Sequence, residues 1–190
     1  MHYIAIFASG AGSNACKIME HFAQNERARV ALVVCNKPDA GVLDIARNQG
    51  VPVFIVERTD FFETENLLAV LAGHRVDFIA LAGFLWLMPP YLVRAFSGKI
   101  VNIHPALLPK FGGKGMYGMR VHEAVKAAGE TQTGITIHSV NERYDDGDTL
   151  FQATCSVEPT DTPETIAQKV HELEHRYFPH VIETILSQPA

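Results

Sequence analysis

Short apolar runs alternate with segments of helical periodicity through the first half of the chain. The apolar runs are expected to be buried strands, at residues 3–8, 30–35, 53–56, 78–82 and 100–104. The segments between the first four runs are expected to be helices, at residues 14–25, 41–49 and 61–71. This alternation is typical of βαβ units, in which crossover helices join parallel strands. The pattern therefore predicts an open, mostly parallel, twisted sheet with helices on both faces.

The second half of the chain departs from this alternation. Residues 105–118 are rich in glycine and proline and are expected to form an irregular loop before a helix at 120–127. Residues 134–140 and 150–157 are expected to form an antiparallel strand pair joined by an acidic turn. A last helix is predicted from Pro163 to about Leu186, because Thr and Pro are favoured at its N-cap and first position. The expected fold class is a Rossmann-like α/β fold with an antiparallel C-terminal strand pair.

Length and composition suit one packed domain spanning residues 1–190. Of the 190 residues, 47% are hydrophobic and 19% are charged, and the sequence has no internal repeat. Lys and Arg together number 16 and Asp and Glu 21, which gives a net charge of −5. General nucleic-acid binders carry the opposite sign, because their affinity depends on neutralising phosphates. We therefore expect no nucleic-acid partner, while the charge does not exclude a small phosphorylated ligand, because backbone N–H groups at a helix start can hold a phosphate.

The sequence also lacks the signals of membrane insertion and secretion. The longest apolar run, at residues 78–88, contains Gly83 and stops at two prolines, which is short of the ~18 residues that a membrane span needs. The three cysteines, Cys16, Cys35 and Cys155, form neither a CxxC motif nor an even disulfide set. No basic leader precedes the first strand. We therefore expect a cytoplasmic protein with no membrane partner.

A glycine loop, Ser-Gly-Ala-Gly-Ser-Asn at residues 9–14, follows the first expected strand and opens the first helix. Glycines allow close backbone approach, and the free N–H groups at a helix start favour an anion such as phosphate. Gly10-x-Gly12-x-x-Ala15 also fits a dinucleotide fingerprint, but the second strand ends without the acidic residue that binds the ribose. An NAD(P)-dependent oxidoreductase and a plain strand-to-helix connection therefore remain the weaker alternatives to a phosphate site.

Asn102 and His104 lie at the end of the fifth expected strand, where ligands bind in open parallel sheets. Residues two apart on a strand share a face, so these two side chains are expected to project together. A carboxylate facing His104 would raise its pKa and keep a proton donor available near neutral pH. The acidic turn offers Asp145, Asp146 and Asp148 for this role, and their spacing leaves the choice open.

The run His-Glu-Leu-Glu-His at residues 171–175 is a literal HExxH motif, the signature of zinc proteases. Such a site needs a third protein ligand, and only His180 and Glu183 follow as ligand types. We therefore expect no metal at this motif. Its polar side chains are expected to line a cleft or to face solvent instead.

Six segments carry a family resemblance: FASGAGSN at 7–14, CNKPDA at 35–40, LAGF at 81–84, NIHPALLP at 102–109, GITIH at 134–138 and the DDG of 145–147. Their order resembles the phosphoribosylglycinamide formyltransferases, folate-dependent enzymes of purine synthesis. The NxHPxLLP segment is shared by the wider formyltransferase superfamily, whereas the SGxGSN loop narrows the resemblance to the glycinamide branch. Another folate-dependent formyltransferase or a deformylase of the same superfamily is the alternative.

The resemblance implies a role for each matching residue. The catalytic group would be Asn102, His104 and Asp145. The phosphate of the ribotide substrate would be held by Gly12, Ser13, Asn14, His171 and Glu174. The co-substrate 10-formyltetrahydrofolate would lie along Asn102, Leu85, Trp86, Leu87, Met88, Asn141, Glu142, Arg143, Tyr144 and Asp145. A monomer or homodimer is expected.

The implied reaction is attack by the amine of 5'-phosphoribosylglycinamide on the formyl carbon of the folate, without a metal. Asn102 and protonated His104 would stabilise the negative charge on the formyl oxygen, and Asp145 would orient the imidazole. A non-catalytic ribotide-binding module is less favoured, because binding alone does not need a poised proton donor.

Two departures from the family pattern affect the implied folate site. Residues 111–118 form a longer segment than in compact members, and we expect a mobile lid there. Trp86 stands where other members carry a basic or smaller residue, and no clear match is found for an arginine near the helix after Asp60.

Overall fold

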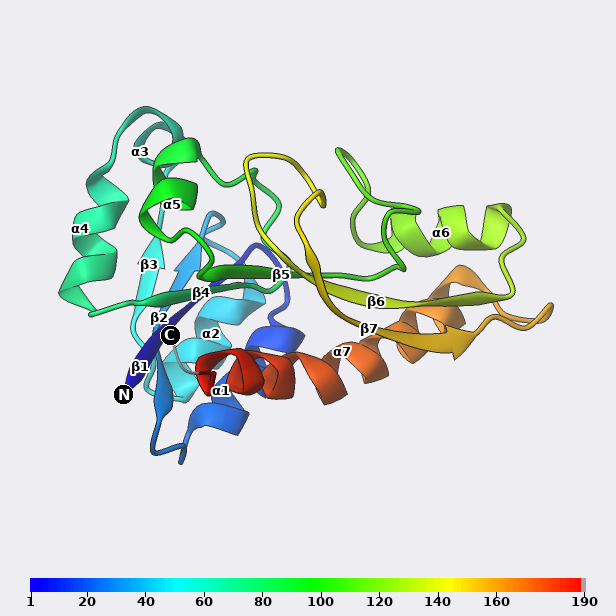
Figure 1. The fold of residues 1–190 in the computed structure, drawn as a ribbon, viewed down its shortest axis with the longest axis horizontal. Coiled ribbons are helices and arrows are strands. Elements are labelled where there is room, and N and C mark those ends of the chain that lie inside the picture. Colours follow the sequence, from blue (N-terminus) through cyan, green and yellow to red (C-terminus); the bar gives the residue numbers. More distant parts are fainter. Residues whose placement is uncertain (189–190) are drawn as a thin grey trace.

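The computed structural model describes residues 1–188 and contains a seven-stranded sheet with the order β3-β2-β1-β4-β5-β6-β7 (Figure 1). Five strands are parallel: β1 (His2–Ala8), β2 (Ala28–Cys35), β3 (Val53–Ile55), β4 (Phe78–Leu81) and β5 (Ile100–His104). The last two, β6 (Gln132–Ser139) and β7 (Thr149–Ser156), each run antiparallel to the strand before them in the sheet. The predicted fold class, a mostly parallel sheet with an antiparallel C-terminal pair, is confirmed.

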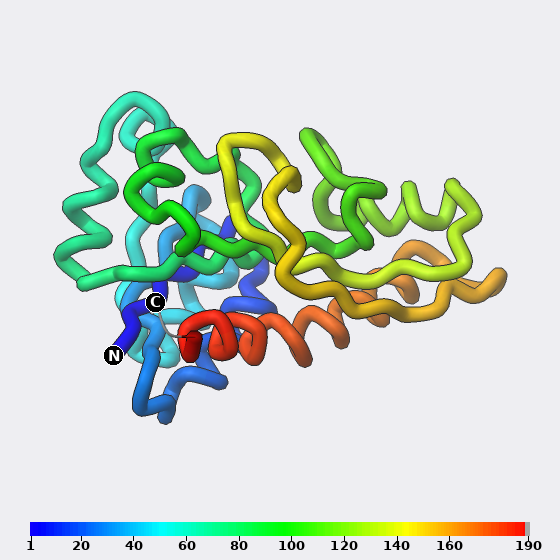
Figure 2. The backbone as a smooth tube through the Cα atoms, viewed as in Figure 1, coloured from blue at the N-terminus to red at the C-terminus, as the bar shows by residue number. Residues whose placement is uncertain are grey.

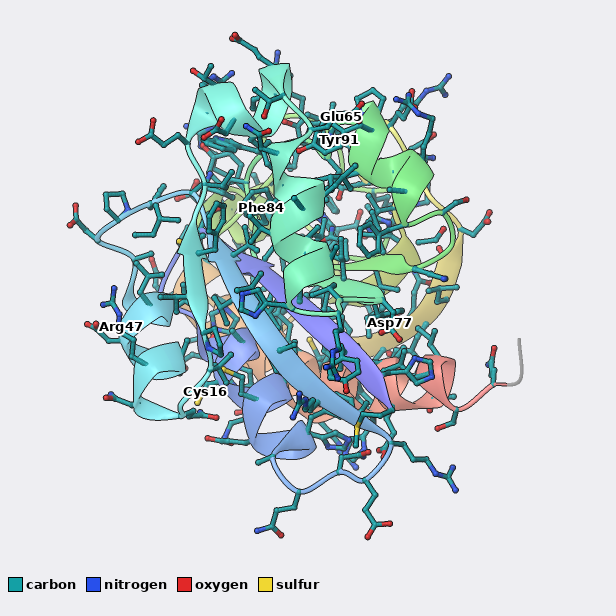
Figure 3. The ribbon with its side chains drawn as sticks, turned by 90° about the vertical axis from the view of Figure 1, so that its left-hand side faces the viewer. Cys16, Arg47, Glu65, Asp77, Phe84 and Tyr91 are labelled. Carbon is teal, nitrogen blue, oxygen red and sulfur yellow. The ribbon has the colours of Figure 1, made fainter. Side chains whose placement is uncertain are left out.

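Helices cover both faces of the sheet, as Figure 3 shows from the side of β3. One face carries α1 (Ser13–Phe22), α2 (Gly41–Asn48) and α7 (Pro163–Leu186). The other carries α3 (Arg58–Glu63), α4 (Asn66–Gly73) and α5 (Pro90–Ala95), while α6 (Met119–Ala127) packs against α7. None of these helices is both long and apolar enough to cross a bilayer, as far as residues 1–188 are concerned.

Alternation along β1 builds two separate hydrophobic cores. Ile4 and Ile6 are fully buried against α1, α2 and α7, whereas Ala5 and Phe7 are buried against the helices of the opposite face. Each fully buried large side chain contributes about 1.5–3 kcal/mol. Because both faces of the central strands are covered, these strands are apolar throughout, which is the pattern that the sequence showed.

The segment predicted as one helix at residues 61–71 is two helices, α3 and α4, and that prediction is wrong. Thr64 adopts an extended conformation between them, with φ −129°. Its hydroxyl donates to the carbonyl of Asp60 (2.9 Å) and accepts from the N–H of Asn66 (3.3 Å), which ends one helix and begins the next. Helix α5 was not predicted from the sequence, although its first residue is Pro90 and proline is favoured at that position.

The parallel strands end at one edge of the sheet, and the chain turns away from β1 toward β2 on one side and β4 on the other. Ligands bind at such a switch point in open α/β sheets. The loop at residues 105–118 and the turn between β6 and β7, yellow in Figure 2, stand on the same side of the sheet. The N–H of Gly113 donates to the carboxylate of Asp145 (2.9 Å), so the two segments are in contact.

Candidate active site

A cavity of about 750 Å³ opens at this edge of the sheet, within the size range of small-molecule pockets. Most of the residues predicted to bind ligands line it: Gly12, Ser13, Asn14, Leu85, Trp86, Leu87, Met88, Asn102, His104, Arg143, Tyr144, Asp145, His171 and Glu174. Asn141 and Glu142 are not among the lining residues. The side chain of Asn141 instead accepts from the N–H of Arg143 (2.8 Å) and donates to Asp146 (3.3 Å), which closes the turn.

At one end of the cavity, the wall is formed by the backbone around Gly12. Gly12 has a left-handed conformation with φ 85°, and a Cβ added there would lie 2.7 Å from Val42. It precedes Ser13, the first residue of α1, and this helix start has no side-chain cap. The N–H groups of the first turn are therefore available to an anion in the cavity.

Asn14 and Glu174 join α1 to α7 at this end of the cavity. The Asn14 Nδ2 donates to Glu174 Oε2 (3.0 Å), and the Glu174 residue is only 5% exposed. Burial raises the pKa of Glu174, and the Asn14 hydrogen bond and the nearby His171 oppose that rise only in part. The Asn14 Oδ1 is buried and has no hydrogen-bond partner among residues 1–188. This end of the cavity therefore combines free backbone donors with a carboxyl group that gains a proton readily.

Asn102 and His104 project from one face of β5, as predicted, and Asp145 reaches both of them from the β6–β7 turn. The Asn102 Nδ2 lies 3.4 Å from Asp145 Oδ1, and the His104 Nδ1 lies 3.5 Å from Asp145 Oδ2. Asp145 has φ 53°, and a Cβ on Gly147 would overlap the carbonyl oxygen of Ser139. The turn thus folds tightly enough to bring this carboxylate back over β5.

The pKa of His104 is lowered, which corrects the expectation that a facing carboxylate keeps the ring cationic near neutral pH. Burial is the largest cause; the charge of Asp145 and the Phe111 carbonyl raise the pKa but do not compensate for it. The His104 Nε2 lies 2.7 Å from the Phe111 carbonyl oxygen, to which it donates. In the absence of substrate the ring is therefore a neutral imidazole with its proton on Nε2.

Asp145 is an ionised carboxylate at neutral pH. Burial alone would raise its pKa, but the neighbouring His138 and His104 side chains and the N–H of Gly113 together outweigh burial and lower it. The group at the end of β5 thus consists of a buried anion, a neutral imidazole and a carboxamide. Such a set can hold one proton in place and donate hydrogen bonds toward the cavity.

A family model described as formyl transferase matches residues 2–182. The chain belongs to the formyl transferase family. Among curated relatives of this formyl transferase, "Phosphoribosylglycinamide formyltransferase, chloroplastic" of Arabidopsis thaliana is 44% identical over 97% of the chain, which spans 65% of that protein. The "Phosphoribosylglycinamide formyltransferase" of Bacillus subtilis (strain 168) is 40% identical, with 98% of the chain and 95% of the relative covered.

Solved structures give the same result for the fold. The glycinamide ribonucleotide transformylase 1 from Geobacillus kaustophilus has a TM-score of 0.88 and 36% identity, with 98% of this formyl transferase and 100% of that chain covered. The resemblance to phosphoribosylglycinamide formyltransferases that the six sequence segments indicated is therefore confirmed.

His138 orients Asn102 in this formyl transferase, a role that was not predicted from the sequence. The two residues pair across β5 and β6, and the Asn102 Nδ2 donates to His138 Nε2 (3.0 Å). The His138 Nδ1 donates to the carbonyl of Ser139 (2.8 Å), which leaves Nε2 as the acceptor. His138 and Thr136 are two residues apart on β6, so their side chains share a face, and their partners on β5 also share a face. This spacing was the signal from which a role for His138 could have been predicted.

Arg58 is a second residue near the site that was not predicted from the sequence. Its guanidinium lies 5.7 Å from the centre of the Trp86 ring and 4.9 Å from that of Phe62. Trp86 lines the cavity of the formyl transferase, so Arg58 places a positive charge beside the cavity wall. Arg58 is the first residue of α3 and precedes Asp60, whereas the family arginine was expected near the helix after Asp60.

Proposed function

We propose that this formyl transferase moves the formyl group from 10-formyltetrahydrofolate to the amine of 5'-phosphoribosylglycinamide, a step of purine synthesis. The observation that carries the proposal is one cavity that joins an anion-binding helix start at Gly12 to the buried group of Asn102, His104 and Asp145. The names of the relatives support the same substrates. We also propose that residues 1–190 act as one formyltransferase domain, on the strength of a family match over residues 2–182.

The ribotide phosphate is placed at the start of α1. Gly12, Ser13 and Asn14 offer backbone N–H groups, and burial, which raises the pKa of Glu174, favours the protonated form of this carboxyl group beside the phosphate. His171, whose Nε2 lies 3.9 Å from Glu174 Oε2, completes the pocket from α7. The phosphate then anchors the ribotide with its glycinamide amine directed along the cavity toward β5.

The folate is placed along residues 85–88 and the β6–β7 turn. The N–H of Leu85 donates to Ser9 Oγ (3.0 Å), which fixes this stretch to the glycine loop. Met88 is buried, and Trp86 presents its ring to the cavity wall beside Arg58. An apolar wall of this kind suits the flat pteridine, and the guanidinium suits a carboxylate of the folate tail.

The reaction is proposed to proceed by direct attack. The amine nitrogen bonds to the formyl carbon, negative charge develops on the formyl oxygen, and the bond from that carbon to N10 of the folate breaks. The Asn102 N–H that makes only a 3.4 Å contact with Asp145 donates to the formyl oxygen instead. The His104 Nε2–H leaves the carbonyl of Phe111 and also donates to the formyl oxygen. A proton leaves the amine and reaches N10 through water. No step uses a metal.

The division of roles is testable with His104→Ala. We expect this variant to retain ribotide binding, because the phosphate contacts lie at the other end of the cavity, and to lose turnover by at least about 10²-fold. Equal losses of binding and turnover would contradict the division.

The function itself is tested by product analysis. Purified protein is incubated with both substrates, and mass spectrometry should find formylated ribotide and tetrahydrofolate in equal amounts. A binding module would give neither product, and a deformylase would release formate without formylated ribotide. Saturable NAD(P)H binding without folate binding would support the oxidoreductase alternative.

A reducing compartment such as the cytoplasm is proposed from three free cysteines, although the Arabidopsis relative is named chloroplastic.

A further inference from the structure

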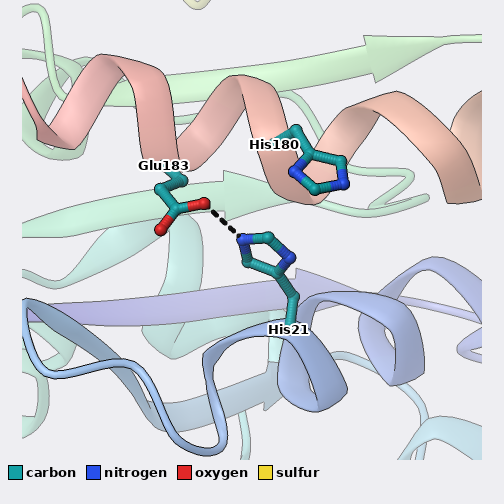
Figure 4. Close-up of side chains that lie close together, drawn as sticks. All are labelled: His21, His180 and Glu183. Atoms are coloured by element: carbon teal, nitrogen blue, oxygen red, sulfur yellow. Dashed lines mark hydrogen bonds and ion pairs between the residues drawn. The ribbon is translucent and has the colours of Figure 1, made fainter.

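Three side chains that bind metals in other proteins meet between α1 and α7, away from the cavity (Figure 4). They are His21 near the end of α1 and His180 and Glu183 on the last turns of α7. One ligand atom from each lies within 4.8 Å of the others. None of the three residues lines the cavity at the sheet edge, so the cluster has no part in the proposed reaction.

The cluster is already held in place by hydrogen bonds. The His21 Nε2 lies 2.8 Å from Glu183 Oε2, and Asn25 Nδ2 donates to Glu183 Oε1 (2.7 Å). The His21 and His180 rings meet edge to face, with centroids 4.7 Å apart. His180 and Glu183 are three positions apart on one helix and therefore share a face. Solvent has access, because His180 is exposed and the Glu183 side chain is 41% exposed.

We propose that His21, His180 and Glu183 form a zinc-binding site that clamps α1 to α7. Two imidazoles and one carboxylate are a common zinc ligand set, with a water molecule as the fourth ligand. Ca²⁺ and Mg²⁺ prefer sites made of oxygen atoms, so the nitrogen ligands favour zinc over them. Asn25 keeps its bond to the second carboxylate oxygen and orients Glu183, as outer-shell groups do in known sites.

Binding requires only a small local rearrangement. Zinc bonds of about 2.0–2.2 Å place ligand atoms roughly 3.3 Å apart. The ligand atom of His180, within 4.8 Å of the other two, must therefore move inward by up to about 1.5 Å. The His21 Nε2 and Glu183 Oε2, 2.8 Å apart, must separate slightly. His180 is exposed and able to supply this movement by a change of rotamer. On binding, the 2.8 Å contact between His21 and Glu183 is replaced by a bond from each residue to the ion.

The clamp connects the two helices that hold the proposed phosphate end of the cavity. α1 begins with Ser13 and Asn14, and α7 carries Glu174, which accepts from Asn14 (3.0 Å). A zinc ion at the far ends of the same two helices adds a second link between them. Because zinc binds the folded chain at a site absent from the unfolded one, it is expected to raise the unfolding temperature.

The HExxH run on the same helix is the competing location for zinc. The rings of His171 and His175 lie 6.2 Å apart and stacked. Within residues 1–188, the one group of three ligand side chains whose atoms converge within 4.8 Å excludes both of these histidines. The geometry therefore assigns the zinc site to the residues that follow the motif.

The test is a zinc titration of the full chain after removal of metals with a chelator and dialysis. Isothermal calorimetry should show one Zn²⁺ per chain at the high-affinity site, and scanning calorimetry should show a higher unfolding temperature with zinc. The variants His180→Asn and Glu183→Gln should each weaken zinc binding at least about tenfold. The matched control is the double variant His171→Asn/His175→Asn, which should bind zinc as the wild type does.

Two results would overturn the proposal. One is zinc affinity that is lost in the double variant and retained in His180→Asn, which would move the site to the HExxH run. The other is the absence of saturable zinc binding in the wild type, which would leave an ordinary His21–Glu183 contact. His180 is exposed, so its substitution does not endanger folding, and the circular dichroism of each variant without metal should match that of the wild type.

Discussion

The carboxylate of Asp145 lies 3.5 Å from the Nδ1 of His104, although one residue belongs to a turn and the other to a central strand. In Asp145→Asn the charge that opposes burial is lost, so the pKa of His104 should fall below its already lowered value. Turnover should fall at least about tenfold, because the imidazole loses its stabilising anion. The NMR titration of the His104 ring and steady-state kinetics measure the two effects.

The matched control is Asp146→Asn in the same turn. Asp146 contacts Asn141 (3.3 Å) and Arg143 (3.6 Å) and does not line the cavity. Its substitution should leave both the His104 titration and turnover unchanged. Similar effects from the two variants would show that Asp145 acts only through the shape of the turn.

Asn102→Ala should lower kcat by about 10²–10³, the cost of removing one hydrogen-bond donor to a developing oxyanion in other enzymes. The dissociation constant of the ribotide should change less than about twofold, because the phosphate is held at Gly12 and Glu174. Steady-state kinetics and calorimetric binding separate the two quantities. The control variant is Asn48→Ala, which removes an exposed amide side chain at the end of α2 and should leave both quantities unchanged.

Ribotide affinity should fall as pH rises through the raised pKa of Glu174, because its carboxylate then repels the phosphate. In Glu174→Gln the side chain stays neutral, so this fall should disappear. Calorimetric dissociation constants between about pH 5 and 8 test the difference. Glu172→Gln, at an exposed position of the same helix, should behave as the wild type. Parallel pH profiles for wild type and Glu174→Gln would rule out this carboxyl group as the cause.

Glu174 also makes the free energy of unfolding depend on pH, because its pKa differs between the folded and unfolded states. Its folded-state pKa lies above the unfolded one, so the folded state binds more protons between the two values and stability falls as pH rises through that interval. Removing the ionisable group should therefore make Glu174→Gln more stable than the wild type above the interval. Urea unfolding at two pH values measures this difference.

His122 should destabilise the protein at acidic pH. Burial and the nearby His171 and His104 lower its pKa to about 4, and its Nδ1 has no hydrogen-bond partner within the described part of the chain. The unfolded chain binds a proton at His122 more readily than the folded chain does. The contribution of His122 to the free energy of unfolding is therefore fully present above its ordinary pKa of 6.5 and is lost as pH falls toward 4. The loss is on the order of 3 kcal/mol.

His122→Leu should remove this part of the pH dependence of the free energy of unfolding, which urea denaturation at several pH values measures. The half-buried His74 on the opposite face of the sheet supplies the control variant, His74→Leu. An unchanged slope in His122→Leu would show that other groups govern acid unfolding.

The parts of the site that depend on regular elements could be predicted from the sequence. Asn102 and His104 share a face because residues two apart on a strand do so, and the glycine loop opens α1 where the first apolar run ends. The choice of Asp145 could not be derived from spacing. It depends on a left-handed backbone at Asp145 and on Gly147 packed against Ser139, which neither strand nor helix periodicity encodes.

The charge state of His104 was predicted wrongly for a similar reason. The sequence suggested a carboxylate partner, which does raise the pKa, but burial of the ring beside Phe111 has the larger effect. Burial at that point depends on how residues 105–118 fold over β5, and a loop without periodicity gives no signal of its path. The meeting of His21 with Glu183 likewise depends on the packing of α1 against α7.

The most direct test of formyl transfer is the absorbance change that accompanies loss of the formyl group from 10-formyltetrahydrofolate. The account predicts that this change requires the glycinamide ribotide, that its total amplitude follows the amount of ribotide added, and that Asn102→Ala slows it strongly. Loss of the formyl group at the same rate without ribotide, or no loss with both substrates present, would contradict the account.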